Sequence, residues 1–169
     1  MKNKQKTPIA CPIDQYATHQ RALARTALKA AIEFPELPIV EFGVGYYSTP
    51  ILREIAAALN VRIISYSSSD VWAQRFTAER QNEELHIINP DEWPKLSIPE
   101  CSMLFVDNEQ SVINRFKHIE RLQAYYKFLV FHDADIVPKR GLKLTNVPKH
   151  LQLELFKDQV PHTAVWSML

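Results

Sequence analysis

Residues 39–50 of the chain read IVEFGVGYYSTP, and this stretch decides the fold. It begins with strand-forming residues that have few polar interruptions, as expected for a central strand covered on both faces. Gly43 and Gly45 follow, and they allow the backbone to turn sharply and to approach a ligand without a Cβ in the way. Thr49 is a good N-cap, and Pro50 suits the first position of a helix. The stretch therefore predicts a buried strand, a tight glycine turn and the start of a helix.

Length and composition predict a single folded domain. A chain of 169 residues with 46% apolar residues can bury a sizeable core. Residues 1–12 are expected to form a disordered or loosely packed tail, and residues 13–169 the domain. The formal net charge of +1 provides no overall field to attract nucleic acid or an anionic membrane. With no apolar run of spanning length, no signal peptide and only Cys11 and Cys101 as thiols, we expect a cytoplasmic protein.

Helical and strand patterns alternate along the chain. Helices are expected over residues 16–34, from residue 49 onward, after the serines at 67–69 (holding Val71, Trp72 and Phe76) and after Ser111. Strands are expected at residues 39–44, 61–66, 85–88, 103–106 and 128–131, with a loop over 138–148. Residues 153–156 and 163–166 read as two strands with no room for a helix between them, which indicates an antiparallel hairpin. The pattern predicts a three-layer α/β sandwich whose seven-stranded sheet is mostly parallel, with one antiparallel strand.

Polar side chains gather where the predicted strands end. In a parallel sheet, ligands bind beyond the carboxyl ends of the strands, at the point where the chain order reverses. The residues at these ends are Glu41 with Gly43 and Gly45, residues 67–70, Asn89 and Asp91, Asp107 and Asn108, and residues 132–135. Each alone could simply begin a polar loop, but the whole set on one edge predicts a functional site. Glu41 stands out because a carboxylate inside an apolar strand must find partners or serve a function.

These features resemble a class I S-adenosylmethionine-dependent methyltransferase over nearly all of the chain. Glu41-x-Gly43-x-Gly45 resembles the first motif of that family, Phe105-Val106-Asp107 its fourth-strand motif, and the terminal hairpin its reversed seventh strand. The stretch EFGVGYYSTPIL, together with HDAD after the fifth strand, is similar to a small branch found in bacteria and phages. The resemblance implies a Rossmann-like methyltransferase fold, S-adenosylmethionine as cofactor and a methyl acceptor, a small molecule or another, that the sequence does not identify.

The resemblance also implies roles for the residues at the strand ends. Glu41 would orient the glycine turn or bind the amino group of the cofactor. A carboxylate at the end of the second strand normally accepts both ribose hydroxyls, but here that position is Ser67 and the nearest acid is Asp70; a hydroxyl cannot replace a bidentate charged acceptor. Asn89 or Asp91 would bond to the adenine amino group, and Trp72 would cover the adenine unless it belongs to the core. The expected cofactor-binding residues are Glu41, Gly43, Gly45, Ser48, Ser67, Ser68, Asp70, Asp91 and Asp107.

Methyl transfer is an in-line displacement, so positioning of the acceptor supplies much of the rate. Where the acceptor also needs a base, His132 is the best-placed candidate, with Asp133 beside it, because imidazole titrates near neutrality. A strand-end histidine that merely bonds to a loop carbonyl is an equal alternative. Asp107, Asp133 and Asp135 could together hold Mg²⁺, as in metal-dependent O-methyltransferases that they resemble. A divalent cation is nevertheless the less expected outcome, because one or two of these acids should cap loops or bind the cofactor.

Two other classes of protein compete with this interpretation. A Rossmann dehydrogenase needs Gly-x-Gly-x-x-Gly and an acid about 20 residues further on, whereas this chain has Ser48 at the third glycine position and serines in place of the acid. A methyltransferase-like fold that no longer catalyses and serves as a binding or interaction module stays open. Ser67 in place of the acid and the lack of an inserted substrate-recognition domain both favour that alternative, and the tyrosine pairs at 46–47 and 125–126 could form its partner surface.

Overall fold

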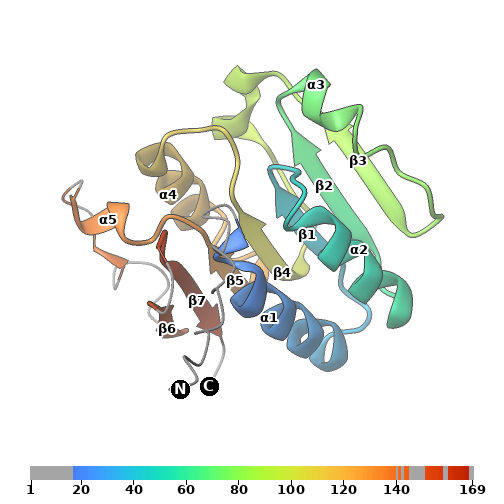
Figure 1. Cartoon of the computed structure of the whole chain (residues 1–169), viewed down its shortest axis with the longest axis horizontal. Helices are drawn as coiled ribbons and strands as arrows, with labels where there is room; N and C mark the ends of the chain where they lie inside the picture. Colours follow the sequence, from blue (N-terminus) through green and yellow to red (C-terminus); the bar gives the residue numbers. More distant parts are fainter. Residues whose placement is uncertain (1–16, 140, 142, 145–150, 158–159, 168–169) are drawn as a thin grey trace, which may run out of the picture.

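The computed structural model describes residues 17–139, 141, 143–144, 151–157 and 160–167. A seven-stranded sheet with the strand order β3-β2-β1-β4-β5-β7-β6 forms the centre of the molecule (Figure 1). The strands are β1 (Ile39–Phe42), β2 (Ile63–Ser67), β3 (Glu83–Ile87), β4 (Cys101–Val106), β5 (Tyr126–Phe131), β6 (Gln152–Phe156) and β7 (Thr163–Ser167). The helices are α1 (Gln20–Glu33), α2 (Thr49–Ala58), α3 (Asp70–Ala73), the 3₁₀ helix η2 (Pro90–Lys95), α4 (Val112–Arg121) and α5 (Ile136–Lys139).

Strand pairing confirms the predicted sheet. β1 lies between β2 and β4 and is parallel to both, while β3 extends the parallel sheet beyond β2 and β5 extends it beyond β4. β7 is antiparallel to both β5 and β6, so it is the reversed strand, and the C-terminal hairpin joins the sheet as expected. The chain order reverses between β1 and β4, whose carboxyl ends are therefore neighbours at the switch point.

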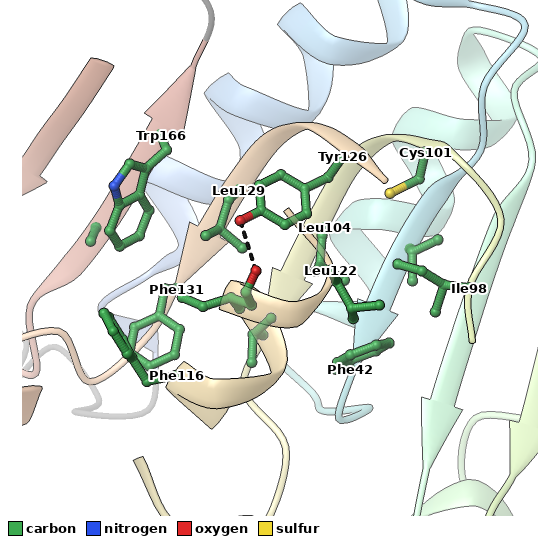
Figure 2. Packing of buried hydrophobic residues seen from close by; sticks show 14 of the residues in the cluster. Phe42, Ile98, Cys101, Leu104, Phe116, Leu122, Tyr126, Leu129, Phe131 and Trp166 are labelled. Carbon is green, nitrogen blue, oxygen red and sulfur yellow. Dashed lines mark hydrogen bonds between the residues drawn. The ribbon is translucent and has the colours of Figure 1, made fainter. Parts of the chain in front are cut away.

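Helices cover both faces of the sheet, which confirms the three-layer architecture. α1 and α2 lie over one face of the sheet (Figure 1). Leu23 and Leu52 belong there to one buried cluster with Ile39 of β1. On the other face, Phe116 of α4 packs in one buried cluster with Phe42, Leu104, Leu129, Phe131 and Trp166 (Figure 2). The hydroxyl of Tyr126 donates a hydrogen bond to the carbonyl of Ile119 at 3.1 Å, which joins β5 to α4. In the described part of the chain, no helix is both long and apolar enough to cross a membrane.

Several predicted boundaries differ from the observed ones. β1 ends at Phe42 because Gly43 leaves the strand with φ +91°. The N-cap of α2 is Ser48 and not Thr49, and the hydroxyls of both residues serve hydrogen bonds inside the fold, described below. α3 spans only Asp70–Ala73, so Phe76 lies beyond it and the prediction that this helix contains Phe76 is wrong. The tail predicted at residues 1–12, Cys11, and most of the loop predicted at 138–148 lie outside the described residues.

Candidate functional site

A cavity of about 430 Å³ lies where β1 and β4 end. Its lining consists of residues 43–48 after β1, residues 107–109 after β4, His19 directly before α1, and Trp72 of α3. This is the switch point of the sheet, where ligands of open α/β folds bind. The volume is within the range of pockets for small molecules and cofactors. The geometry therefore marks this cavity as the candidate site.

Gly43 allows the two loops of the cavity to approach each other closely. An added Cβ would come within 2.4 Å of the carbonyl oxygen of Asp107 and 2.6 Å of the Cα of Asn108, and its φ of +91° is rarely adopted by other residues. The close approach that Gly43 permits is thus to the backbone of the chain itself. Gly45 differs, because an added Cβ would meet only the hydroxyl of Ser48, at 3.7 Å. Space beside Gly45 is consequently part of the cavity.

Glu41 is fully buried beneath the glycine turn and does not line the cavity. Its carboxylate accepts hydrogen bonds from the hydroxyls of Ser48 (2.7 Å), Thr49 (3.0 Å) and Ser65 (2.8 Å). The hydroxyl oxygen of Thr49 in turn accepts a hydrogen bond from the backbone N–H of Gly45 at 2.9 Å. Burial raises the pKa of Glu41 to about 7, although the hydroxyl hydrogen bonds act in the opposite direction. Through these bonds Glu41 orients the turn and the start of α2 from below.

The end of β2 obtains a carboxylate from another loop. Ser67 is fully buried, and its hydroxyl makes 3.2 Å hydrogen bonds with the carbonyl and the N–H of Ser69. The next hydroxyl, of Ser68, accepts from the indole N–H of Trp93 at 3.1 Å and donates to the carboxylate of Glu109 at 2.9 Å. Glu109 belongs to the loop after β4 and lines the cavity. An acid therefore lies beside β2 even though the strand itself ends in serine.

Two predicted acids lie apart from the cavity lining. Asp70 is exposed in the first turn of α3. Asp91 is exposed in η2, where its backbone N–H donates to the side chain of Asn89 at 3.1 Å. Asn89 and Asp91 border a separate hollow on the surface. Contacts of Asp70, Asn89 and Asp91 with a cofactor stay predictions.

Aromatic side chains form one wall of the cavity. The ring of Trp72 meets that of Tyr46 edge-on, with centroids 5.4 Å apart, and stacks with that of Phe76 at 6.3 Å. Arg75 donates to the hydroxyl of Tyr46 at 2.7 Å and lies over the Trp72 ring, 5.3 Å from its centroid. Trp72 is 37% exposed, so it offers an aromatic surface to a planar ligand. We call Tyr46 and Trp72, which line the cavity, the aromatic wall; Arg75 and Phe76 pack against it.

Two buried histidines, His19 and His132, lie close to Asp107. Nδ1 of His132 lies 3.1 Å from a carboxylate oxygen of Asp107, and its Nε2 lies 3.0 Å from the hydroxyl of Thr18. The ring of His19 meets that of His132 edge-on, with centroids 4.7 Å apart. Burial, reinforced by His132, lowers the pKa of His19 to about 4, so His19 is neutral at pH 7. Burial also acts to lower the pKa of His132, but the carboxylates of Asp107 and Asp133 outweigh it and the pKa is raised.

Arg115 of α4 bridges two of the three acids that were expected to bind a metal ion. Its guanidinium pairs with Asp107 at 3.0 Å and with Asp133 at 2.9 Å. Asp135 instead accepts a hydrogen bond from the backbone N–H of His162 at 3.1 Å. The structure thus does not gather Asp107, Asp133 and Asp135 into the Mg²⁺ site that the sequence suggested.

The cavity contains part of the predicted set and adds residues that the sequence did not single out. Of the expected residues, the lining includes Gly43, Gly45, Ser48 and Asp107, as well as Trp72. The others lie outside the lining: Glu41, Ser67, Ser68, Asp70, Asp91, His132 and Asp133. Sequence reasoning did not identify His19, Glu109 or Arg115. Glu109 could have been found from the polar run DNEQ at the end of β4, whereas His19 sits in a segment that reads only as amphipathic helix.

The sheet order, the reversed β7 and the helices on both faces define the Rossmann-like fold of class I methyltransferases. Rv0187 from MTB, solved with a bound cofactor, matches with a TM-score of 0.61 and 16% identity over 96% of this chain and 83% of that chain. The putative methylase HI0767 from Haemophilus influenzae matches with a TM-score of 0.63 and 10% identity over 89% of this chain and 98% of that chain. Magnesium protoporphyrin IX methyltransferase from Synechocystis PCC 6803, with bound SAH (S-adenosylhomocysteine), matches with a TM-score of 0.58 and 10% identity over 95% of this chain and 88% of that chain. No family model matches the sequence, and no curated protein matches it significantly.

Proposed function

We propose that this chain binds S-adenosylmethionine in the cavity at the ends of β1 and β4 and transfers its methyl group to an acceptor. The observation that carries this proposal is the position of the cavity. It lies at the switch point of a methyltransferase fold, between the glycine turn and the loop after β4. Structural neighbours of the chain include methyltransferases solved with SAH bound.

The residues around the cavity suit this cofactor chemically. S-adenosylmethionine, when bound, supplies a methyl group on a positively charged sulfur. Trp72 offers an aromatic surface for a planar base, and the open space beside Gly45 admits a ligand close to the backbone. Glu109 offers a carboxylate that can accept charge-assisted hydrogen bonds from hydroxyl groups. Glu109 also gives the cavity a negative charge that attracts a cationic ligand, whereas the charge of Asp107 is paired with Arg115.

Positioning is the main contribution that we assign to the chain itself. Methyl transfer requires in-line geometry, and the residues enclosing the cavity would hold the two reactants in that geometry. His132, which the sequence suggested as the base, is 4% exposed and holds the hydroxyl of Thr18 on one side and Asp107 on the other. We therefore assign His132 the role of orienting Asp107, and its role as a base stays a prediction.

Calorimetric titration of the full chain with S-adenosylmethionine and with S-adenosylhomocysteine tests the proposal. We expect saturable binding of each, and we expect Gly45→Leu to abolish it because a branched side chain would fill the space beside Ser48. Ala58→Leu adds a similar side chain at an exposed position of α2 and should bind like the parent. Absence of binding by the parent, or unchanged binding by Gly45→Leu, would place the function elsewhere.

A binding module without catalysis is the second candidate, and the burial of Ser67 favours it. With no carboxylate on β2 itself, the cofactor contact depends on Glu109 from a different loop. Such a module would bind S-adenosylmethionine without consuming it. Transfer of a labelled methyl group from S-adenosylmethionine to any fraction of a cell extract would decide in favour of the enzyme.

A further inference from the structure

We propose that His19, Asp107 and His132 form a binding site for a divalent transition-metal ion in the wall of the cavity. The three side chains come from the residue before α1, the loop after β4 and the loop after β5. One ligand atom from each of them lies within 4.8 Å of the other two. Two imidazoles and one carboxylate are a ligand set that proteins use for zinc and non-haem iron, with further coordination positions left open. This site goes beyond the proposed function and does not depend on it.

His19 provides the first argument, because its ring is buried without being satisfied. It is 2% exposed, and neither ring nitrogen makes a hydrogen bond of normal geometry within the described residues. The backbone of Tyr47 lies near the ring but is not aligned for a normal hydrogen bond with it. A buried nitrogen that has lost water and gained no partner is costly, and a native structure rarely leaves one unexplained. A metal ion bound to one of these nitrogens would supply the missing partner.

His132 provides the second argument, because a hydrogen bond at one ring nitrogen fixes the orientation of its ring. Its Nε2 lies 3.0 Å from the hydroxyl of Thr18, and its Nδ1 lies 3.1 Å from Asp107 without forming a well-aligned hydrogen bond. Metal-binding histidines usually have the second ring nitrogen fixed in this way. A proton on Nε2, donated to the hydroxyl of Thr18, would leave the lone pair of Nδ1 free to bind the same ion as Asp107.

The charge around the three side chains favours a cation. Asp107 and Asp133 contribute two negative charges and Arg115 one positive charge, so the group has one net negative charge when both histidines are neutral. Arg115 also fixes the carboxylate of Asp107, as supporting residues do around metal sites. Imidazole nitrogens select zinc, iron, cobalt or nickel over magnesium and calcium, which prefer oxygen. The site thus differs in both ligands and metal from the acid set that the sequence suggested.

The distances between the ligand atoms are close to those in a site that holds a metal ion. Bonds of about 2.0–2.2 Å place neighbouring ligand atoms roughly 3–3.5 Å apart. The 3.1 Å between Nδ1 of His132 and the carboxylate of Asp107 already meets this value. All ligand atoms lie within 4.8 Å of one another, so the side chains would need to approach only modestly. Because His19 and Asp107 line the cavity, the bound ion would lie in the cavity wall. If the proposed methyl transfer also holds, an acceptor oxygen or sulfur bound there would lose its proton more readily.

Metal titration of the full chain after treatment with a chelator tests the site. We expect Zn²⁺ and Co²⁺ to bind at one ion per chain by calorimetry, and Co²⁺ to give visible absorption bands. His19→Ala and Asp107→Asn should each weaken binding at least about 100-fold, since each removes a ligand. His86→Ala, which removes an exposed histidine from β3, should bind like the parent. No binding by the parent, or parent-like binding by His19→Ala, would overturn the proposal.

A second variant tests the role of His132 without replacing His132 itself, because removal of that buried ring could disturb the fold. Thr18→Val keeps the shape of the side chain but removes its hydrogen bond to Nε2, so affinity should fall about 10–100-fold while the fold is retained. Thr26→Val, which changes a buried threonine on α1 outside the cluster, is the matched control. Excess Mg²⁺ should not displace Co²⁺, and displacement would contradict a site with two histidines. These titrations contain no S-adenosylmethionine, so their outcome is separate from that of the proposed function.

Discussion

The carboxylate of Glu109 accepts a 2.9 Å hydrogen bond from the hydroxyl of Ser68, which joins the loop after β4 to the end of β2. A carboxylate is therefore present beside β2, although it is separated from that strand by many residues of sequence. From the sequence alone, Ser67→Glu is expected to restore the missing acceptor and tighten cofactor binding. The structure reverses that expectation, because Ser67 is fully buried and a carboxylate there would be forced into the interior.

Glu109→Gln should weaken the binding of S-adenosylmethionine. A hydrogen bond to a charged group contributes roughly 1.5–3 kcal/mol, so loss of the charge should cost about 10–100-fold in affinity. Calorimetric titration measures the change directly. Glu120→Gln, an exposed acid on α4, is the control and should bind like the parent. Equal affinity of Glu109→Gln and the parent would remove Glu109 from the cofactor site.

Trp72→Ala should also weaken cofactor binding, because it removes the exposed ring of the aromatic wall. Stacking of a base on an aromatic side chain is worth roughly 1–3 kcal/mol, which corresponds to about 5–100-fold in affinity. Trp72→Phe keeps an aromatic ring and should retain most of the binding. If the two variants bind equally well, the ring does not contact the adenine.

Gly43→Ala should destabilise the fold, while Gly45→Ala should not. At Gly43 the added Cβ would clash with the backbone of Asp107 and would require a positive φ, a conformation that costs roughly 1–3 kcal/mol before the clash is counted. At Gly45 the nearest atom is 3.7 Å away. Urea denaturation of both variants measures the free energy of unfolding. Similar losses in the two variants would show that the loops do not interlock at Gly43.

Glu41 should make stability fall as the pH rises from about 4.5 to about 7. In the folded chain Glu41 keeps its proton up to a pKa of about 7, whereas in the unfolded chain it ionises near 4.5. Between these values the folded state binds more protons than the unfolded state, so raising the pH favours unfolding by up to roughly 3 kcal/mol. Above pH 7 the contribution of Glu41 no longer changes.

Glu41→Gln isolates this effect, because glutamine has a similar shape and does not titrate. We would measure the free energy of unfolding of the parent and of the variant at pH 5 and pH 8 by chemical denaturation. The decrease between the two pH values should be larger in the parent. A decrease of the same size in both proteins would mean that Glu41 is ionised in the folded state at low pH.

Local patterns in the sequence were sufficient for the fold but only partly for the site. Buried strands, the Ser111 cap and the closing hairpin each leave a signal within a few neighbouring residues, and all three are present. The site instead depends on contacts between distant segments. His19 and His132 meet only because α1 packs against β4 and β5, and a helical pattern does not reveal which end of the helix lies beside a strand end. The burial of Ser67 could not be predicted either. It depends on packing by other segments, which the sequence of β2 does not encode locally.

The contact of Gly43 with the backbone at Asp107 and Asn108 has a mechanical consequence. No side chain lies between the two segments, and the backbone N–H of Asp107 donates to the carbonyl of Phe42 at 2.8 Å. We therefore expect a ligand that displaces the segment bordering the cofactor space to displace the segment that carries Asp107 as well. Occupancy on either side of the cavity would therefore alter affinity on the other side, and by the reciprocity of linked equilibria the two effects would be equal in size.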